Sequence, residues 1–352
     1  MTRTNERRLL HPMLAALCAG VLLMAGSGIA QGQAPAPAAA KTLGTIERVD
    51  PRFDQIIPRG AALEVLADGY KWVEGPVWDR KASRVLFSDI PSNSVFEWTE
   101  AGGAKLFLKP SGYLGEAPFT GREPGSNGLT FDKEGRLVLC QHGERRVARR
   151  EADGRFTALA DRYQGKRFNS PNDLVFSSKG DLYFTDPAYG LPKTFDDPAR
   201  ELSWAGVYRL SPDGKLSLLV QDLKAPNGIA LSPDEKTLYV AQSYPERAVV
   251  MAYDLRPEGT VANGRVFFDM TPWMKTKGPG LPDGIKVDRA GNLLSTGPGG
   301  VHVFTAKGEH LGSLITGVPT ANLAFGGDGS VLYVTANTAL CRIRTGTKGL
   351  GF

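Results

Sequence analysis

The sequence predicts an all-β protein, a six-bladed β-propeller with four-stranded blades spanning residues 61–352. Three observations point to this fold class. The 352 residues include 42 glycines and 24 prolines, which suits many short strands joined by tight turns. A strand–turn–strand pattern occurs six times along the chain. None of these repeats sustains the 3.6-residue apolar period of a helix, which excludes a helical solenoid.

Each repeat consists of an apolar strand, a turn rich in Asp, Gly or Pro, and a second apolar strand. The six repeats begin at Glu74, Asn127, Asn172, Asn227, Asp283 and Ala321. Their start points are 38 to 56 residues apart, as expected for four-stranded blades joined by loops of variable length. One blade cannot bury both of its faces alone, so six blades are expected to close into a ring. Residues Ala61 to Asp68 are predicted to supply the outer strand that joins the last blade to the first.

The N-terminus resembles an export signal. Three arginines precede an apolar run from Met13 to Leu23, which ends in small residues, so residues 1–30 are predicted to be a signal peptide cleaved near Ala30. The run is shorter than the roughly 20 apolar residues of a membrane anchor. Residues 31–60 are predicted to be a Pro/Ala-rich linker and an N-terminal segment, and the mature protein is expected in the periplasm or outside the cell.

The charge balance excludes several classes of partner. The net charge is +5, and removing residues 1–40, which hold three basic residues and one acid, leaves +3. No polybasic run remains, so neither nucleic acid nor a membrane surface is an expected partner. We expect a small-molecule partner and a monomer or weak dimer. Cys140 and Cys341 are interpreted as buried strand residues, and a disulfide between them is left open.

The first residue of each repeat carries the main functional signal. It always lies five positions before the turn-forming Asp, Ser or Gly, and in five of six repeats it is an acid or an amide. Equivalent positions in a propeller converge on its axis, so a ring of oxygen atoms is expected there. Such ligands suit a hard divalent cation, with calcium first and zinc or magnesium as alternatives. The competing interpretation is that the Asn-Gly and Asp-Gly pairs only form turns. The ring residues are Glu74, Asn127, Asn172, Asn227 and Asp283.

At these residues the chain resembles the gluconolactonase, regucalcin (senescence marker protein) and luciferin-regenerating-enzyme family, whose members are calcium-dependent propellers. Segments that carry the resemblance include EGPVWD at Glu74, NSPNDLVFSSKGDLYFTDP around Asn172, APNGIALSPDEKTLYV around Asn227 and LPDGIKVDRAGNL around Asp283. It covers nearly all of residues 62–345. The resemblance implies a metal held by Glu74, Asn227 and Asp283, with Asn172 near metal and substrate. Paraoxonases and diisopropyl-fluorophosphatases look similar in this ring.

The resemblance implies a calcium-dependent lactone hydrolase that opens aldonolactones or related cyclic esters. Metal would polarise the carbonyl and stabilise the oxyanion. The base that activates water is either Asp283, to which the resemblance assigns the role, or His142, whose ordinary pKa suits it. His302 and His310 are interpreted as structural.

Further substrate contacts are expected from residues around the ring. Asn127 and Asn172 would touch substrate from the ring itself, and Tyr189 would cover the pocket. Asp173 would either orient its neighbour Asn172 or serve as a cap or turn residue. Arg145 would either attract an acidic group or belong to a solvated charged face, which is the favoured interpretation. In the regucalcin branch an arginine precedes the second of these asparagines by two residues, and Ser170 stands there in this chain. The alternatives are an aryl-ester or phosphotriester hydrolase and a non-catalytic binding propeller.

Overall fold

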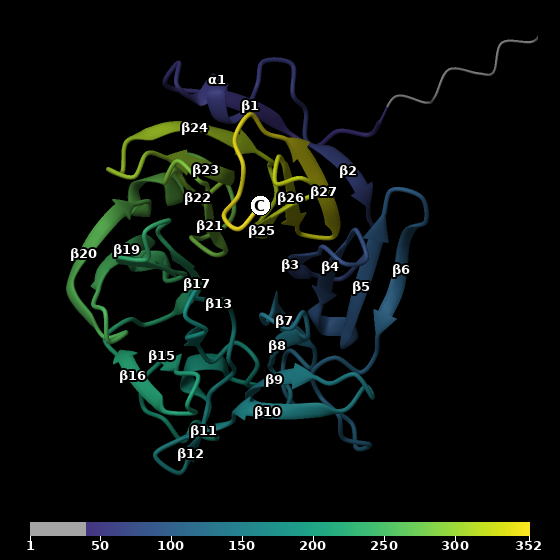
Figure 1. The fold of residues 1–352 in the computed structure, drawn as a ribbon, viewed down its shortest axis with the longest axis vertical. Coiled ribbons are helices and arrows are strands. Elements are labelled where there is room, and N and C mark those ends of the chain that lie inside the picture. The colour runs from purple at the N-terminus through teal and green to yellow at the C-terminus, as the bar shows by residue number, and fades with distance from the viewer. Residues whose placement is uncertain (1–39) are drawn as a thin grey trace, which may run out of the picture. The chain divides into compact units, whose positions relative to one another are not determined.

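The computed structural model describes residues 40–352, which form a ring of six antiparallel sheets around a central axis (Figure 1). This arrangement confirms the predicted six-bladed β-propeller. In each blade the first strand of the repeat lies closest to the axis, and the following strands lie progressively farther out. The predicted signal peptide, residues 1–30, lies outside the described residues. Within residues 40–352, no helix has the length and apolar character needed to cross a bilayer.

The first three blades follow the chain in order from the axis to the rim, and a small hairpin lies between blades two and three. Blade one contains β3 (Val73–Asp79), β4 (Arg84–Asp89), β5 (Ser94–Thr99) and β6 (Gly103–Leu108). Blade two contains β7 (Ser126–Phe131), β8 (Leu137–Gln141), β9 (Arg146–Arg150) and β10 (Phe156–Ala160). The hairpin is β11 (Arg162–Tyr163) with β12 (Lys166–Arg167). Blade three contains β13 (Leu174–Phe176), β14 (Leu182–Asp186), β15 (Gly206–Leu210) and β16 (Leu216–Val220).

The last three blades include the two strands from the N-terminal side of the first repeat. Blade four contains β17 (Pro226–Leu231), β18 (Thr237–Gln242), β19 (Val249–Leu255) and β20 (Val261–Asp269). Blade five contains β21 (Ile285–Val287), β22 (Leu293–Gly297), β23 (Gly300–Phe304), β24 (His310–Ile315) and the additional outer strand β1 (Thr45–Arg48). Blade six contains β25 (Thr320–Gly326), β26 (Val331–Ala336), β27 (Ala339–Arg344) and β2 (Glu64–Ala67).

Helical structure in residues 40–352 is confined to single turns. One is α-helical and four are 3-10 turns: α1 (Phe53–Ile56), η1 (Ile90–Ser92), η2 (Thr194–Asp196), η3 (Pro245–Arg247) and η4 (Thr271–Lys275).

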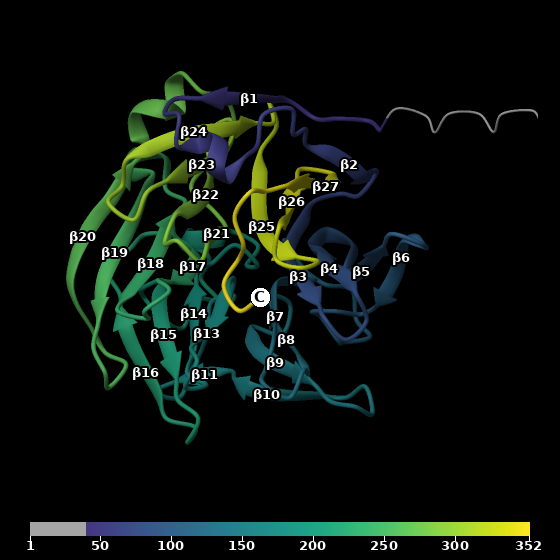
Figure 2. The same cartoon turned by 45° about the horizontal axis from the view of Figure 1, so that its top comes forward.

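Strand β2 closes the ring as the sequence predicts. It pairs antiparallel with β27, with Glu64 opposite Arg342, and so forms the outer edge of blade six before the chain enters blade one. The first and last parts of the described chain therefore share one sheet, seen side by side in Figures 1 and 2. Closure of this kind leaves few exposed strand edges.

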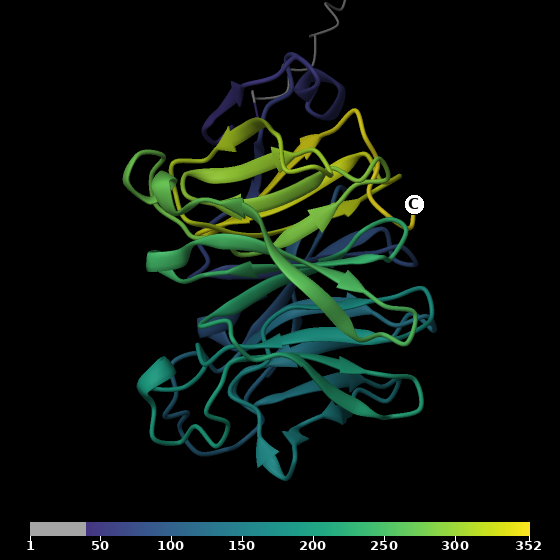
Figure 3. The same ribbon diagram turned by 90° about the vertical axis from the view of Figure 1, so that its left-hand side faces the viewer.

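The segment before β2 lies against blades five and six. Strand β1 pairs with β24 through Thr45 opposite Ile315, and α1 lies beside it on the outside of the ring (Figure 3). Phe53 and Ile57 are fully buried in one core cluster with residues of blades five and six, including Leu314 and Leu323. Residues 40–60 therefore belong to the same compact unit as the propeller.

Replacing Phe53 with Ala tests how much this segment stabilises the fold. We expect the free energy of unfolding to fall by about 3–5 kcal/mol, because a fully buried aromatic ring leaves a cavity. Leu106→Ala is the control, since Leu106 is 56% exposed, and it should change stability by less than about 0.5 kcal/mol. Urea denaturation measures both. A loss below about 1 kcal/mol for Phe53→Ala would show that the segment does not support the ring.

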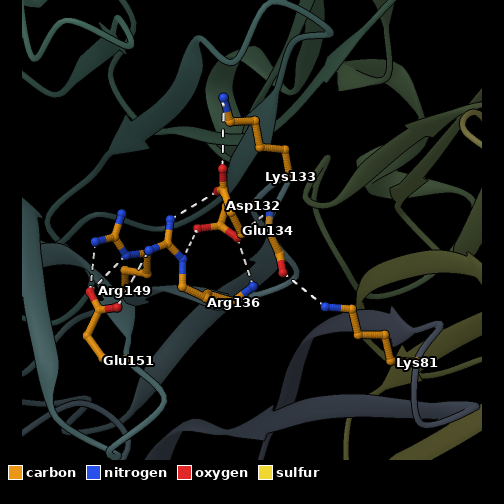
Figure 4. Close-up of polar contacts among 7 residues, drawn as sticks. All are labelled: Lys81, Asp132, Lys133, Glu134, Arg136, Arg149 and Glu151. Carbon is orange, nitrogen blue, oxygen red and sulfur yellow. Dashed lines mark hydrogen bonds and ion pairs between the residues drawn. The ribbon is translucent and has the colours of Figure 1, made fainter.

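The turn inside the second repeat is held by the side chain of its turn-forming aspartate, Asp132. In blade two, Asp132 Oδ1 accepts hydrogen bonds from the backbone N–H groups of Glu134 (3.1 Å) and Arg136 (2.8 Å), and Oδ2 pairs with the Arg136 guanidinium (Figure 4). Lys81 of blade one donates to the Glu134 carbonyl across the blade boundary at 3.0 Å. The Glu134 and Arg136 side chains are 48% and 35% exposed, so their ion pair stabilises the fold little. The Asp132 carboxylate, whose side chain is only 9% exposed, chiefly defines the turn.

Both cysteines within the described residues are free thiols. Cys140 lies in β8 and Cys341 in β27, and both are completely buried. Burial raises the pKa of the Cys341 thiol to about 12 and that of Cys140 well above its usual range. The interpretation as buried strand residues is confirmed, and the structure holds no disulfide between them.

His302 is a structural histidine, as expected. Its Nε2–H donates to the Pro298 carbonyl (3.0 Å), and its Nδ1 accepts from the Ser313 hydroxyl (2.8 Å). The ring also lies 4.8 Å from that of Trp273. Burial lowers the pKa of His302 from 6.5 to about 3, because the charged imidazolium would lose its hydration.

This shift predicts a loss of stability in acid. The unfolded chain takes up the His302 proton near pH 6.5 and the folded chain only near pH 3, so stability falls as pH drops below about 6.5. At pH 5 the contribution is about 2 kcal/mol. We expect His302→Asn to reduce the difference in unfolding free energy between pH 7 and pH 5 by about this amount. An unchanged pH dependence in the variant would contradict the assignment.

Candidate metal centre

The ring residues lie where the inner strands depart from regular pairing. The register with the second strand shifts between Glu74 and Val77 in blade one, between Ser126 and Leu129 in blade two, and between Pro226 and Ile229 in blade four. In blades three and five the regular strand starts only after the ring residue. Such irregularities re-aim side chains, so the acids and amides leave the blade plane at the axis.

In most repeats the residue after the ring position is glycine, and the close approach of the neighbouring blade explains why. A Cβ atom on Gly75 would lie 2.1 Å from the Asn127 carbonyl oxygen, and one on Gly228 would lie 2.0 Å from the Asp283 carbonyl oxygen. Neighbouring blades therefore meet at these glycines with no room for a side chain. The pairs Asn127-Gly128 and Asn227-Gly228 lie inside strands β7 and β17. The interpretation of these pairs as turn formers is wrong.

Four carboxylates gather at this end of the axis. Glu74 is 3% exposed, and burial with the charges of Asp173 and Glu123 raises its pKa to about 8. Asp283 is partly buried, and burial followed by the charge of Glu74 raises its pKa well above the usual range. No salt bridge links Glu74, Asp283 or Asp173 to a basic side chain within residues 40–352. These three carboxylates therefore have no basic partner within the described residues.

Several polar atoms of the site have no hydrogen-bond partner. The side-chain oxygens Oδ1 of Asn127, Asn227 and Asp283 are buried and accept no hydrogen bond. The Ser243 hydroxyl fixes the orientation of the Asn227 side chain, because Asn227 Nδ2 donates to it at 3.0 Å. This leaves Asn227 Oδ1 free. Unpaired buried acceptors are costly, and a cation on the axis would satisfy them.

The donor set fits a hard cation better than a soft one. Among residues 40–352, no three His, Cys, Asp or Glu side chains converge as a metal site, so amide oxygens must complete any coordination shell here. Oxygen ligands of mixed charge suit calcium. Glu74, Asn227 and Asp283 would hold the ion, with Asn127 and Asn172 beside them; Asn172 is 2% exposed at the equivalent position of blade three.

Tyr189, which the sequence analysis expects to cover the pocket, lies close to Asp283 and Asn227 of the ring. Its hydroxyl is 3.4 Å from the Ser243 carbonyl oxygen, and its ring contacts Phe195 edge-on at 5.4 Å. Burial, followed by the charge of Asp283, raises the pKa of Tyr189. The hydroxyl therefore stays protonated near Asp283 and can donate a hydrogen bond.

Asp173 lies beside the ring and lines a cavity of about 600 Å³ together with Gly75, Lys286 and Asn322, and residues Leu350 to Phe352 lie at the same cavity. Its Oδ1 accepts from the Leu174 N–H at 2.9 Å, and its buried Oδ2 has no partner. Asp173 thus adds negative charge next to Glu74 and Asp283.

Arg145 is placed apart from the ring. Its guanidinium is buried and donates to the backbone carbonyl oxygens of Phe168 (2.6 Å) and Ala199 (3.2 Å). Burial lowers its pKa. These contacts tie the loop after β8 to blade three and give the side chain a structural task.

His142 lies beside the ring and has a partner that the sequence did not indicate. Its Nδ1 is 2.8 Å from Glu123 Oε2, and its Nε2 is buried without a partner. The charge of Glu123 also raises the pKa of Glu74 and Asp283, which places the pair next to the ring. Glu123 precedes β7 in a loop outside the repeats, so the repeat pattern could not identify it.

Comparison with known proteins agrees with this architecture. Residues 72–338 match the model of the SMP-30/gluconolactonase/LRE-like region. The chain belongs to this family. A gluconolactonase of Zymomonas mobilis is 40% identical over 313 residues, which span 88% of each chain. A lactonase of Staphylococcus saprophyticus is 29% identical over 279 residues, covering 75% of this chain and 76% of that one.

Solved structures of the SMP-30/gluconolactonase/LRE-like family share the fold. A gluconolactonase from Xanthomonas campestris superposes with a TM-score of 0.75 at 32% identity, covering 87% of this chain and 97% of the other. A calcium-binding regucalcin from Agrobacterium tumefaciens reaches a TM-score of 0.63 at 22% identity, covering 81% and 94%. The latter likeness shows the propeller fold alone.

The ring predicts that calcium stabilises the folded protein. At free calcium near 100 times its dissociation constant, the unfolding free energy should rise by about 2.7 kcal/mol over that of chelator-treated protein. Glu74→Gln should remove most of this gain, because it deletes one of two charged ligands. Glu258→Gln, an exposed acid on a distant turn, is the control and should keep it. Equal stabilisation of Glu74→Gln and wild type would contradict a cation at the ring.

Proposed function

We propose that this protein is a calcium-dependent lactone hydrolase acting on aldonolactones or related cyclic esters. The observation that carries the proposal is the ring of buried acid and amide oxygens, three of them without partners, whose carboxylates form no ion pair within residues 40–352. The lactonase and gluconolactonase relatives support the same reaction class for this chain. Zinc or magnesium in place of calcium would serve the same ring less well, because calcium tolerates irregular oxygen cages.

The residues of the site divide the work of hydrolysis. Calcium, when bound, would polarise the carbonyl and stabilise the oxyanion. Asn127 and Asn172 would orient the ester, and the protonated Tyr189 hydroxyl would donate to an oxygen of the substrate. Water must lose a proton as it adds to the carbonyl carbon, and the ring oxygen must gain one as the C–O bond breaks. Asp283 or His142 would exchange that proton.

Ser170 bears on the choice of substrate. Its hydroxyl donates to the Pro187 carbonyl (2.7 Å) and accepts from the Gly190 N–H (2.9 Å), so it shapes the loop that carries Tyr189. No cationic side chain stands at this position to bind a sugar hydroxyl or carboxylate. This observation favours a broader range of cyclic esters than sugar lactones alone.

The proposal extends to location and partners. The arginines and apolar run before residue 30 favour export, so the enzyme would act in the periplasm or outside the cell on a diffusible substrate, as a monomer or weak dimer. Detection of mature protein beginning after Ala30 in the periplasmic fraction would support this.

Initial rates of lactone opening test the function. Chelator-treated protein should open glucono-lactone only at the uncatalysed rate, and calcium should restore turnover. Asp283→Ala should lower kcat by at least about 100-fold, because it removes a charged ligand of the cation that stabilises the oxyanion, while Glu258→Gln keeps it. Phenyl acetate and paraoxon are assayed in parallel. Turnover of these two but not of lactones would assign the aryl-ester or phosphotriester function, and no turnover with tight calcium binding would leave a binding propeller.

A further inference from the structure

We infer that Glu123 is a positioning residue that makes His142 Nε2 the proton acceptor for the attacking water. The inference rests on the proposed function and decides between the two candidate bases. Glu123 Oε2 and His142 Nδ1 are 2.8 Å apart, and nothing in the sequence pattern or the family comparison assigns Glu123 a role.

The hydrogen bond sets which imidazole nitrogen carries the proton. A carboxylate oxygen only accepts, so Nδ1 holds the hydrogen and donates it to Glu123. Nε2 is then the nitrogen with a free lone pair. It is buried, and no side chain or backbone group in residues 40–352 donates to it. An unpaired acceptor in a buried position beside the ring is what a general base requires.

The backbone around the pair is held in place from both sides. The Tyr113 N–H donates to the Pro124 carbonyl (2.6 Å), and the His142 N–H donates to the Gly125 carbonyl (3.1 Å), which fixes Glu123 and His142 relative to each other. The Arg122 N–H donates to the Gly190 carbonyl at 3.2 Å. The loop with Glu123 is therefore joined to the loop that carries Tyr189.

Gly190 leaves the space that His142 occupies. A Cβ atom on Gly190 would lie 3.0 Å from the His142 Cβ and 2.9 Å from the Ser170 Cβ. The imidazole is thus confined by the Gly190 backbone on one side and by Glu123 on another, and its side chain is completely buried. Confinement of this kind keeps Nε2 aimed in one direction.

Asp283 is less suited to the same task. In the proposed site it is one of two carboxylates that hold the cation, and a carboxylate bound to a divalent ion is a poor proton acceptor. His142 is not among the proposed ligands of the cation. In the reaction, Nε2 takes a proton from water as the oxygen adds to the carbonyl carbon. It then returns the proton to the ring oxygen as the C–O bond breaks, which yields the hydroxy acid and leaves the imidazole neutral.

The first test is the tautomer of His142, read from its ring nitrogens by NMR in calcium-loaded wild-type protein. We expect the hydrogen on Nδ1 and a bare Nε2 at neutral pH. Glu123→Leu, which removes the acceptor, should shift the hydrogen toward Nε2. A wild-type hydrogen on Nε2, or a tautomer unaffected by Glu123→Leu, would overturn the inference.

The second test separates positioning from structure by kinetics. Glu123→Leu should lower kcat by about 10–100-fold and His142→Asn by about 100-fold or more, with KM within twofold of wild type when each variant is saturated with calcium. The double variant should be no slower than His142→Asn, because both changes disable one unit. Glu116→Gln, an exposed acid on the same loop, is the control and should retain full kcat.

The outcomes distinguish this inference from the proposed function. If wild type opens lactones and Asp283→Ala does not, but Glu123→Leu retains full kcat, the positioning role is wrong and the function stands. If wild type opens no lactone, the proposed function and the base role both fail. The tautomer measurement then still decides whether Glu123 controls the imidazole.

Discussion

The structure depends on an uncompensated cluster of negative charge at the axis of the ring. Glu74 and Asp283 lie close to each other and to the negative charges of Asp173 and Glu123. Burial raises the pKa of both Glu74 and Asp283. Such an arrangement opposes folding unless a proton or a cation neutralises it. Binding energy that a cation gains here therefore also stabilises the closed ring, which couples the chemistry of the site to the fold.

Ring closure and site assembly follow from the same contacts. The glycines after the ring positions let neighbouring inner strands meet at backbone distance, as Gly228 does with the Asp283 carbonyl. Hydroxyl groups of the second strands reinforce these meetings, since Ser88 donates to the Asn127 carbonyl at 2.9 Å and Thr185 to the Asn227 carbonyl at 2.7 Å. The blades thus hold the ring residues in place through main-chain contacts, which leaves the side-chain oxygens available on the axis.

Features that recur in every repeat could be predicted from the sequence. Features of loops that have no counterpart in other blades could not. Six equivalent positions revealed the blades and the ring, because a propeller brings equivalent residues to one axis. The same logic placed β2 in the last blade. It could not reveal Glu123, which belongs to a loop without a counterpart in other blades, nor the burial of Arg145, whose partners are carbonyl oxygens invisible in the pattern. It also left turn formation open as the competing interpretation of the Asn-Gly pairs, because the close approach of a neighbouring strand requires glycine just as a turn does.

The most direct test of this account is a crystal structure of the mature protein grown with calcium and again with terbium, read by anomalous scattering. The account predicts one strong peak on the axis within about 2.3–2.6 Å of oxygens from Glu74, Asn227 and Asp283. The terbium peak should coincide with it. A ring without a peak under these conditions, or a peak held by other residues, would contradict the central claim.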